Sequence, residues 1–156
     1  IQPNALVGEL RLAMRSDDVS KRLPAFMTFA ALGAPIDDAL VTGTIAGMDL
    51  CERAMIIAAA GRAGVQCAVK LAHDWLVEYA PKPSGDPIFV RDVLETLLAS
   101  ASKEVAEKIL LEVASMPNAS AYFLQHLPKA LETLATPTAR AAAVVARAKV
   151  DEEFRR

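Results

Sequence analysis

The amino-acid sequence predicts an all-α protein built from eight or nine short helices. Hydrophobic residues make up 53% of the 156 residues, and much of this share is alanine and leucine, of which alanine is the strongest helix former. Apolar residues recur at helical spacing between capping residues, glycines and prolines. No stretch of four to eight residues alternates between β-branched and polar types, as a half-buried strand would. Together these three observations favour helices throughout.

The first half of the chain is predicted to form four helices, each opened by a recognisable signal. Asn, Asp and Ser side chains accept hydrogen bonds from the free N–H groups of a first turn, and glycine often ends a helix in the left-handed conformation. The predicted starts are Asn4, Ser16–Asp18, Pro35–Asp38 and Asp49, and the predicted ends include Gly33 and a short break bounded by Gly61 and Gly64. Pro24 lies inside the second segment, where it either marks the true start or kinks the helix.

The second half is predicted to form five more helices, four of them after a proline-rich loop. A fifth helix covers about 65–80, and the loop PKPSGDP at 81–87 ends it. Further helices are expected near 88–100, 103–116, 118–135 and 137–154. Thr136 as a cap and Pro137 at the first helical position make the last of these well defined. The chain therefore reads as one all-α domain, 1–156, with a possible hinge at 81–87.

Two segments share a pattern that suggests an internal repeat. LPAFMTFAALGAP (23–35) and LPKALETLATP (127–137) both begin with Leu-Pro and close on a small residue before proline. The second continues through an alanine- and valine-rich helix to residue 150, and in this it resembles repeats of the HEAT/armadillo type. The resemblance implies antiparallel helical hairpins that stack as a small solenoid. An irregular helical bundle would give much the same sequence signals.

The stretch AHDWLVEYA (72–80) carries the most chemically interesting side chains. His73 and Asp74 are neighbours on the predicted fifth helix, so they point about 100° apart and do not converge on one ligand. A helix-borne metal site would also need ligands three or four residues beyond His73, where the chain has Leu76 and Val77. His73 is therefore expected at the edge of the core with a hydrogen-bond partner. Two pairs of side chains remain as candidates for lining a small-molecule pocket. These pairs are His73 with Trp75, and Tyr122 with His126.

The sequence lacks the motifs of most other catalytic and binding sites. There is no nucleophile elbow, phosphate-binding loop or dinucleotide fingerprint, and the two cysteines form neither a zinc motif nor a disulfide framework. We therefore predict no catalytic, cofactor-binding or metal-ligating residue. A net charge of −2 argues against a nucleic-acid partner. Prolines interrupt the longest uncharged runs, 23–36 and 113–128, so no membrane span is expected.

These observations favour a non-catalytic protein–protein interaction or scaffold module, one domain or subunit of a larger assembly. Alanine- and valine-rich faces such as 55–61 and 141–148 suit packing against a protein partner or a second copy. Arg140, Arg147 and Lys149 are predicted to rim that contact. The alternative is a small-molecule-binding protein or enzyme with one of the two inter-helix pockets above. We expect a soluble intracellular protein, cytoplasmic or organellar after processing.

Overall fold

The computed structural model describes residues 3–156, and every regular element in this range is a helix. The helices are α1 (Pro3–Met14), α2 (Val19–Ala31), α3 (Asp38–Ile45), α4 (Leu50–Arg62), α5 (Ala68–Tyr79), α6 (Pro87–Ser100), α7 (Lys103–Ala114), α8 (Ala121–Leu124), α9 (Leu127–Leu134) and α10 (Pro137–Phe154). The prediction of an all-α fold is thus confirmed. The described part of the chain has one helix more than the upper expectation, because one predicted helix is divided.

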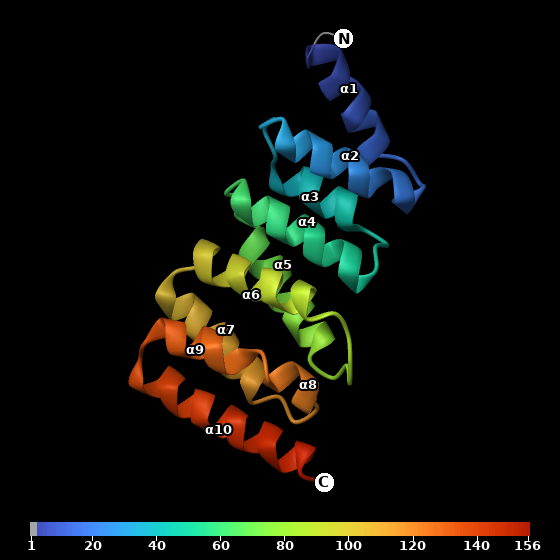
Figure 1. The fold of residues 1–156 in the computed structure, drawn as a ribbon. Helices are drawn as coiled ribbons and strands as arrows, with labels where there is room; N and C mark the ends of the chain where they lie inside the picture. The colour runs from blue at the N-terminus through green and yellow to red at the C-terminus, as the bar shows by residue number, and fades with distance from the viewer. Residues whose placement is uncertain (1–2) are drawn as a thin grey trace.

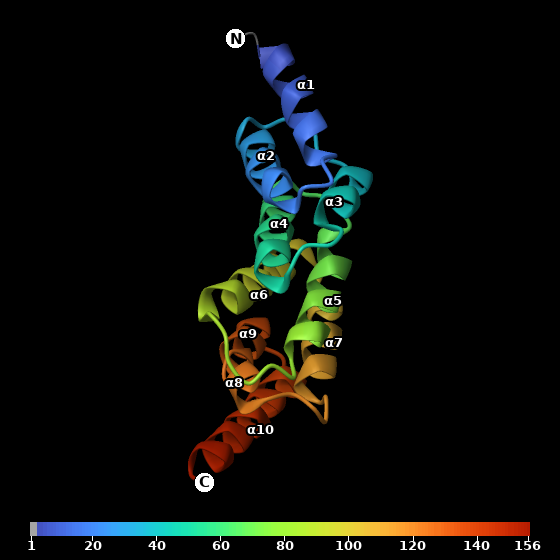
Figure 2. The ribbon, with the colours of Figure 1, turned by 90° about the vertical axis from the view of Figure 1, so that its right-hand side faces the viewer.

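The helices stack in chain order, so that α1 and α10 lie at opposite ends of an elongated molecule (Figure 1). Seen from the side, α2, α4, α6 and α9 form one layer, while α3, α5 and α7 form a second layer beside it (Figure 2). Contacts within the first layer join α2 to α4, α4 to α6, and α6 to α9. At the C-terminal end, α10 packs against α9.

A continuous set of buried apolar side chains holds the layers together from Met14 to Ala143. The largest side chains that are almost completely buried are Phe26 and Phe29 of α2, Ile56 and Ile57 of α4, Trp75 and Leu76 of α5, Leu97 of α6, Leu110 of α7, Phe123 of α8, and Leu127 and Leu131 of α9. Because the core runs the length of the stack, each helix is stabilised by its neighbours along the chain.

Several of the predicted caps are present with the expected hydrogen bonds. Asp37 Oδ1 accepts from the backbone N–H of Leu40 at 2.8 Å, and Thr136 Oγ1 accepts from that of Ala139 at 3.0 Å. Asp49 forms a reciprocal capping box with Glu52 at the start of α4. Such caps depend on residues within one turn, and for this reason the sequence alone could place them.

Two predicted helix boundaries are wrong. Asn4 is not the cap of the first helix, because α1 already begins at Pro3. Gly61 lies inside α4 rather than at a break, and the chain leaves the helix only at Ala63. Gly64 then takes the left-handed conformation, with a φ angle of 74°. Gly61 instead serves the contact between α4 and α6, as its missing side chain leaves room for Thr96.

The helix predicted at 118–135 is divided into α8 and α9. Ser120 caps α8, which begins at Ala121, and its Oγ accepts from the backbone N–H of Phe123 at 3.0 Å. Pro128 has no N–H to donate to the carbonyl of Leu124, so the helical hydrogen-bond series cannot pass through this point. The chain turns at Gln125 and His126 and then restarts as α9.

The loop between α5 and α6 is bound to the start of α8. Ser120 donates from its backbone N–H to the carbonyl of Ala80 at 2.9 Å, and from Oγ to the carbonyl of Lys82 at 2.6 Å. Tyr122 donates its hydroxyl to the carbonyl of Gly85. The hinge at 81–87 stays a prediction, and bending there would require these three hydrogen bonds to break.

Replacing Ala135 by glycine is expected to stabilise the protein. Ala135 ends α9 in the left-handed conformation, with φ 58° and ψ 24°, which costs an L-residue about 1–2 kcal/mol. Glycine avoids that cost but loses more backbone entropy on folding, so the net gain in the free energy of unfolding should be about 0.5–1 kcal/mol. Urea unfolding monitored by circular dichroism measures it. Ala141→Gly, in the regular part of α10, should instead destabilise, and a loss of stability in Ala135→Gly would contradict the expectation.

Candidate functional site

A groove between α6 and α9 is the strongest candidate site in the described part of the chain. It encloses a volume of about 450 Å³, within the range of small-ligand sites. Its apolar lining consists of Leu94, Leu98, Ala99 and Ala130, and its polar lining of Arg91, Glu95, His126, Lys129 and Thr133. The groove therefore joins an apolar surface to a set of charged and hydrogen-bonding side chains.

Helical spacing on two parallel helices builds this groove. On α6, Arg91, Leu94 and Leu98 lie at i, i+3 and i+7, which places them on one face. On the facing element, His126, Ala130 and Thr133 lie at i, i+4 and i+7. Each stripe is visible in the sequence, whereas their juxtaposition is not. Of the predicted pocket residues only His126 lines this groove.

The imidazole of His126 is the most unusual polar group in the groove. Its Nε2 is buried and has no hydrogen-bond partner. The ring contacts Tyr122 edge to face, with 5.4 Å between the ring centroids. Burial lowers the pKa of His126 below its ordinary value, and the positive charge of Arg91 lowers this pKa further. The ring is therefore neutral at pH 7, and Nε2 has hydrogen-bonding capacity that no protein group in residues 3–156 satisfies.

The other predicted pocket pair, His73 and Trp75, is engaged in helix packing. Trp75 is 1% exposed. Its Nε1 donates to the carbonyl of Leu50 at 2.7 Å, and its ring stacks on Tyr79. His73 Nε2 lies 3.0 Å from Glu112 Oε2, which links α5 to α7. These contacts give both side chains a structural role.

His73 also contacts its neighbour in the sequence. Its Nδ1 lies 3.4 Å from Asp74 Oδ1, although the two side chains leave the helix in different directions. Asp74 in turn accepts from Lys70 Nζ at 2.7 Å, one turn earlier on the outer face of α5. The carboxylate of Asp74 is therefore shared between a histidine and a lysine at the surface. This arrangement ties the side chains of α5 to one another.

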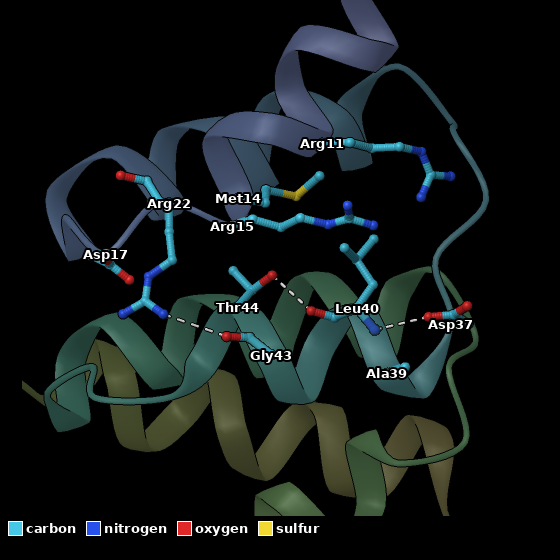
Figure 3. Close-up of a pocket in the computed structure, with 11 residues that line it drawn as sticks. Arg11, Met14, Arg15, Asp17, Arg22, Asp37, Ala39, Leu40, Gly43 and Thr44 are labelled. Carbon is cyan, nitrogen blue, oxygen red and sulfur yellow. Dashed lines mark hydrogen bonds between the residues drawn. The ribbon is translucent and has the colours of Figure 1, made fainter.

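A second pocket, of about 410 Å³, lies between the α1–α2 corner and α3 and is lined by three arginines (Figure 3). Arg22 points down to α3, where it donates to the carbonyls of Gly43 and Ala46. These bonds satisfy carbonyl groups at the C-terminal end of α3. The guanidinium of Arg11 lies 5.0 Å from the centre of the Phe29 ring. Two of the three arginines thus already contribute to the packing of the fold.

Neither cysteine has the environment of a reactive thiol. Burial and a hydrogen bond with Asp38 raise the pKa of Cys67 to about 11. Burial and the nearby charge of Asp49 also raise the pKa of Cys51. Both groups are therefore protonated at pH 7, whereas nucleophilic cysteines depend on the thiolate. Within residues 3–156, no cluster of His, Cys, Asp and Glu side chains is arranged to hold a metal ion.

The arginines and the lysine predicted at a contact rim lie on α10, around an exposed apolar stripe. The inner face of α10 is formed by buried Ala139, Ala143 and Ala146. On the outer side Val144 is 64% exposed and Val145 is 54% exposed, with exposed Ala141 and Ala148 beside them. The predicted rim residues Arg140, Arg147 and Lys149 are all exposed, and Arg147 pairs with Glu132 of α9.

Comparison with known proteins found no matching family model, no matching curated protein and no matching solved structure. The resemblance to HEAT/armadillo-type repeats therefore stays a prediction. Among the helices of residues 3–156, none combines the length and apolar character needed to cross a membrane.

Proposed function

We propose that the chain is a non-catalytic helical interaction module that assembles through the outer face of α10, and that the partner on this face is a second copy. The exposed stripe of Ala141, Val144, Val145 and Ala148 is the observation that carries the proposal. Large aliphatic side chains that face water contribute free energy to association when a partner covers them. In a larger assembly, the module would supply one helical surface of a scaffold.

The spacing of the residues on the outer face of α10 supports a helix as the element that covers the stripe. Pro137, Ala141, Val144 and Ala148 follow each other at spacings of four, three and four residues. This is the spacing at which side chains from one straight helical face mesh with a second helix. Alanine at two of these positions permits a close approach of the two backbones. The inner face of α10 already packs on α9 through three alanines, so both faces suit helical neighbours.

The charges along α10 support an antiparallel second copy. Arg140 lies in the first turn of α10, whereas Asp151, Glu152 and Glu153 lie in its last turns, where Glu152 also pairs with Arg156. In an antiparallel pair, the basic part of one helix faces the acidic end of the other, and the reverse holds at the opposite end. A two-fold axis creates both complementary contacts at once. One helix pair buries little surface, so the dimer should dissociate on dilution.

Substituting glutamate for Val144 is expected to abolish this self-association. Sedimentation velocity of the wild type over a wide concentration range should show the mass rising from 16.6 kDa towards twice that value. Val144→Glu should remain monomeric throughout, because the new carboxylate would lose its water at the contact. Val144 is exposed in the monomer, so circular dichroism and the unfolding midpoint should change little.

Val105→Glu provides the matched control, since Val105 is 42% exposed but lies on α7. It introduces the same charge and should leave the concentration dependence unchanged. A further test exchanges the charges: Arg140→Glu should weaken association, and adding Asp151→Arg should restore part of it. A wild type that stays monomeric at every concentration, or a Val144→Glu variant that still dimerises, would overturn the proposal.

A further inference from the structure

We propose that the groove between α6 and α9 binds a small apolar monocarboxylate, with the hydrocarbon part over Leu94, Leu98 and Ala130 and the carboxylate at the end formed by Arg91, His126 and Lys129. This site is separate from the outer face of α10. It would bind a small ligand, whereas the interaction proposal requires no ligand. The two proposals can therefore succeed or fail independently.

The apolar lining of the groove is the reason for proposing a ligand with a hydrocarbon part. Leu94 and Ala130 are buried, and Leu98 is half-buried at the groove surface. Together with Ala99 they form the apolar wall of the 450 Å³ space. Covering this apolar surface with a hydrocarbon chain in place of water is favourable and contributes to the free energy of binding. A fully hydrated ligand such as an inorganic anion would leave this surface uncovered.

The charge of the ligand follows from the polar lining. Two cations, Arg91 and Lys129, face the groove together with one acid, Glu95. Among residues 3–156, no carboxylate lies within ion-pair distance of Arg91 or Lys129. A single negative charge on the ligand would thus meet two cations that have no partner in the protein. The net positive lining favours a monoanion over an amine.

His126 supplies the hydrogen-bonding part of the argument. Its Nε2 is buried without a partner, a condition that costs free energy unless something bonds to it. The neutral tautomer with its proton on Nε2 can donate to a carboxylate oxygen. Arg91 is close enough to His126 to influence its titration. A carboxylate at this end of the groove would neutralise the guanidinium, and it would accept from the imidazole once the ring turns Nε2 towards the groove.

The direct test is a titration of isotope-labelled full-length protein with sodium octanoate, followed by NMR. Octanoate has ten non-hydrogen atoms, for which a dissociation constant of about 1 mM is expected. Shifts should concentrate on Leu94, Leu98, Ala130 and the His126 ring. Octan-1-ol and octylamine have the same hydrocarbon length without the negative charge, and each should bind about tenfold more weakly. Equal binding of octanoate and octanol would overturn the carboxylate assignment.

Charge variants test the sign of the interaction in both directions. Arg91→Gln/Lys129→Gln should weaken octanoate binding about tenfold, whereas Glu95→Gln should tighten it about two- to threefold. Lys108→Gln changes an exposed lysine of α7 outside the groove and should have no effect. The proposal is overturned if octanoate does not bind saturably, if the charge variants bind like the wild type, or if the shifts appear at Val144 and Val145 instead.

Discussion

Replacing Trp75 by alanine is expected to lower the free energy of unfolding by about 3–5 kcal/mol. Trp75 is 1% exposed and belongs to the core between α4 and α5. The substitution removes its stacking on Tyr79, at 4.6 Å between ring centroids, and leaves a cavity that the surrounding helices can fill only in part. A domain of this size is stable by about 5–15 kcal/mol, so the loss is a large share of the total.

The variant Trp75→Phe separates packing from hydrogen bonding. Phenylalanine keeps an aromatic ring but removes the Nε1 donor that bonds the Leu50 carbonyl at 2.7 Å. Its loss should cost about 0.5–1.5 kcal/mol, the usual net contribution of one hydrogen bond, because the Leu50 carbonyl, in the first turn of α4, keeps its helical donor. Trp75 is the only tryptophan in the chain, so unfolding must be followed by far-ultraviolet circular dichroism in urea rather than by tryptophan fluorescence. A loss below about 1 kcal/mol for Trp75→Ala would contradict this assignment.

Replacing Gly61 by alanine is expected to destabilise the protein, although alanine is normally the better residue inside a helix. Helix propensity alone would give a gain of about 1 kcal/mol. A Cβ atom at position 61, however, would overlap with Thr96 Cγ2 and would lie 3.2 Å from Ser100 Oγ. Thr96 Oγ1 donates to the carbonyl of Asp92 at 2.8 Å, so rotating the side chain would break that bond. We expect a net loss of about 1–3 kcal/mol.

A second substitution identifies the methyl group as the cause. Thr96→Ser removes Cγ2 and keeps the hydroxyl, so Gly61→Ala should be nearly neutral in that background. The resulting coupling energy in a double-mutant cycle should be at least about 1 kcal/mol. Gly43→Ala is the matched control, since nothing lies within 4 Å of its added Cβ, and it should stabilise α3. Strict additivity of Gly61→Ala and Thr96→Ser would rule out the close α4–α6 contact.

The candidate groove could be predicted only in part. The sequence offers one side of it, because His126 is among the predicted pocket residues. Arg91, Leu94 and Leu98 were missed as site residues, since a charged residue and two leucines at helical spacing are typical of any amphipathic helix. Only the packing of α6 beside α9 places them in one groove with His126. His73 shows the same limit, since its partner Glu112 is 39 residues away in the sequence.

What the sequence by itself determined is the local structure: an all-α chain, the caps at Asp37, Asp49 and Thr136, and the alanine- and valine-rich character of α10. These features depend on interactions within one or two helical turns, which composition and spacing describe directly. The tertiary structure decided which glycine ends a helix, which histidine is buried without a partner, and which two helices form a groove. Each of these depends on contacts between distant segments. A helical face has the same sequence pattern whatever it packs against, so only the folded chain distinguishes a core contact from a binding surface.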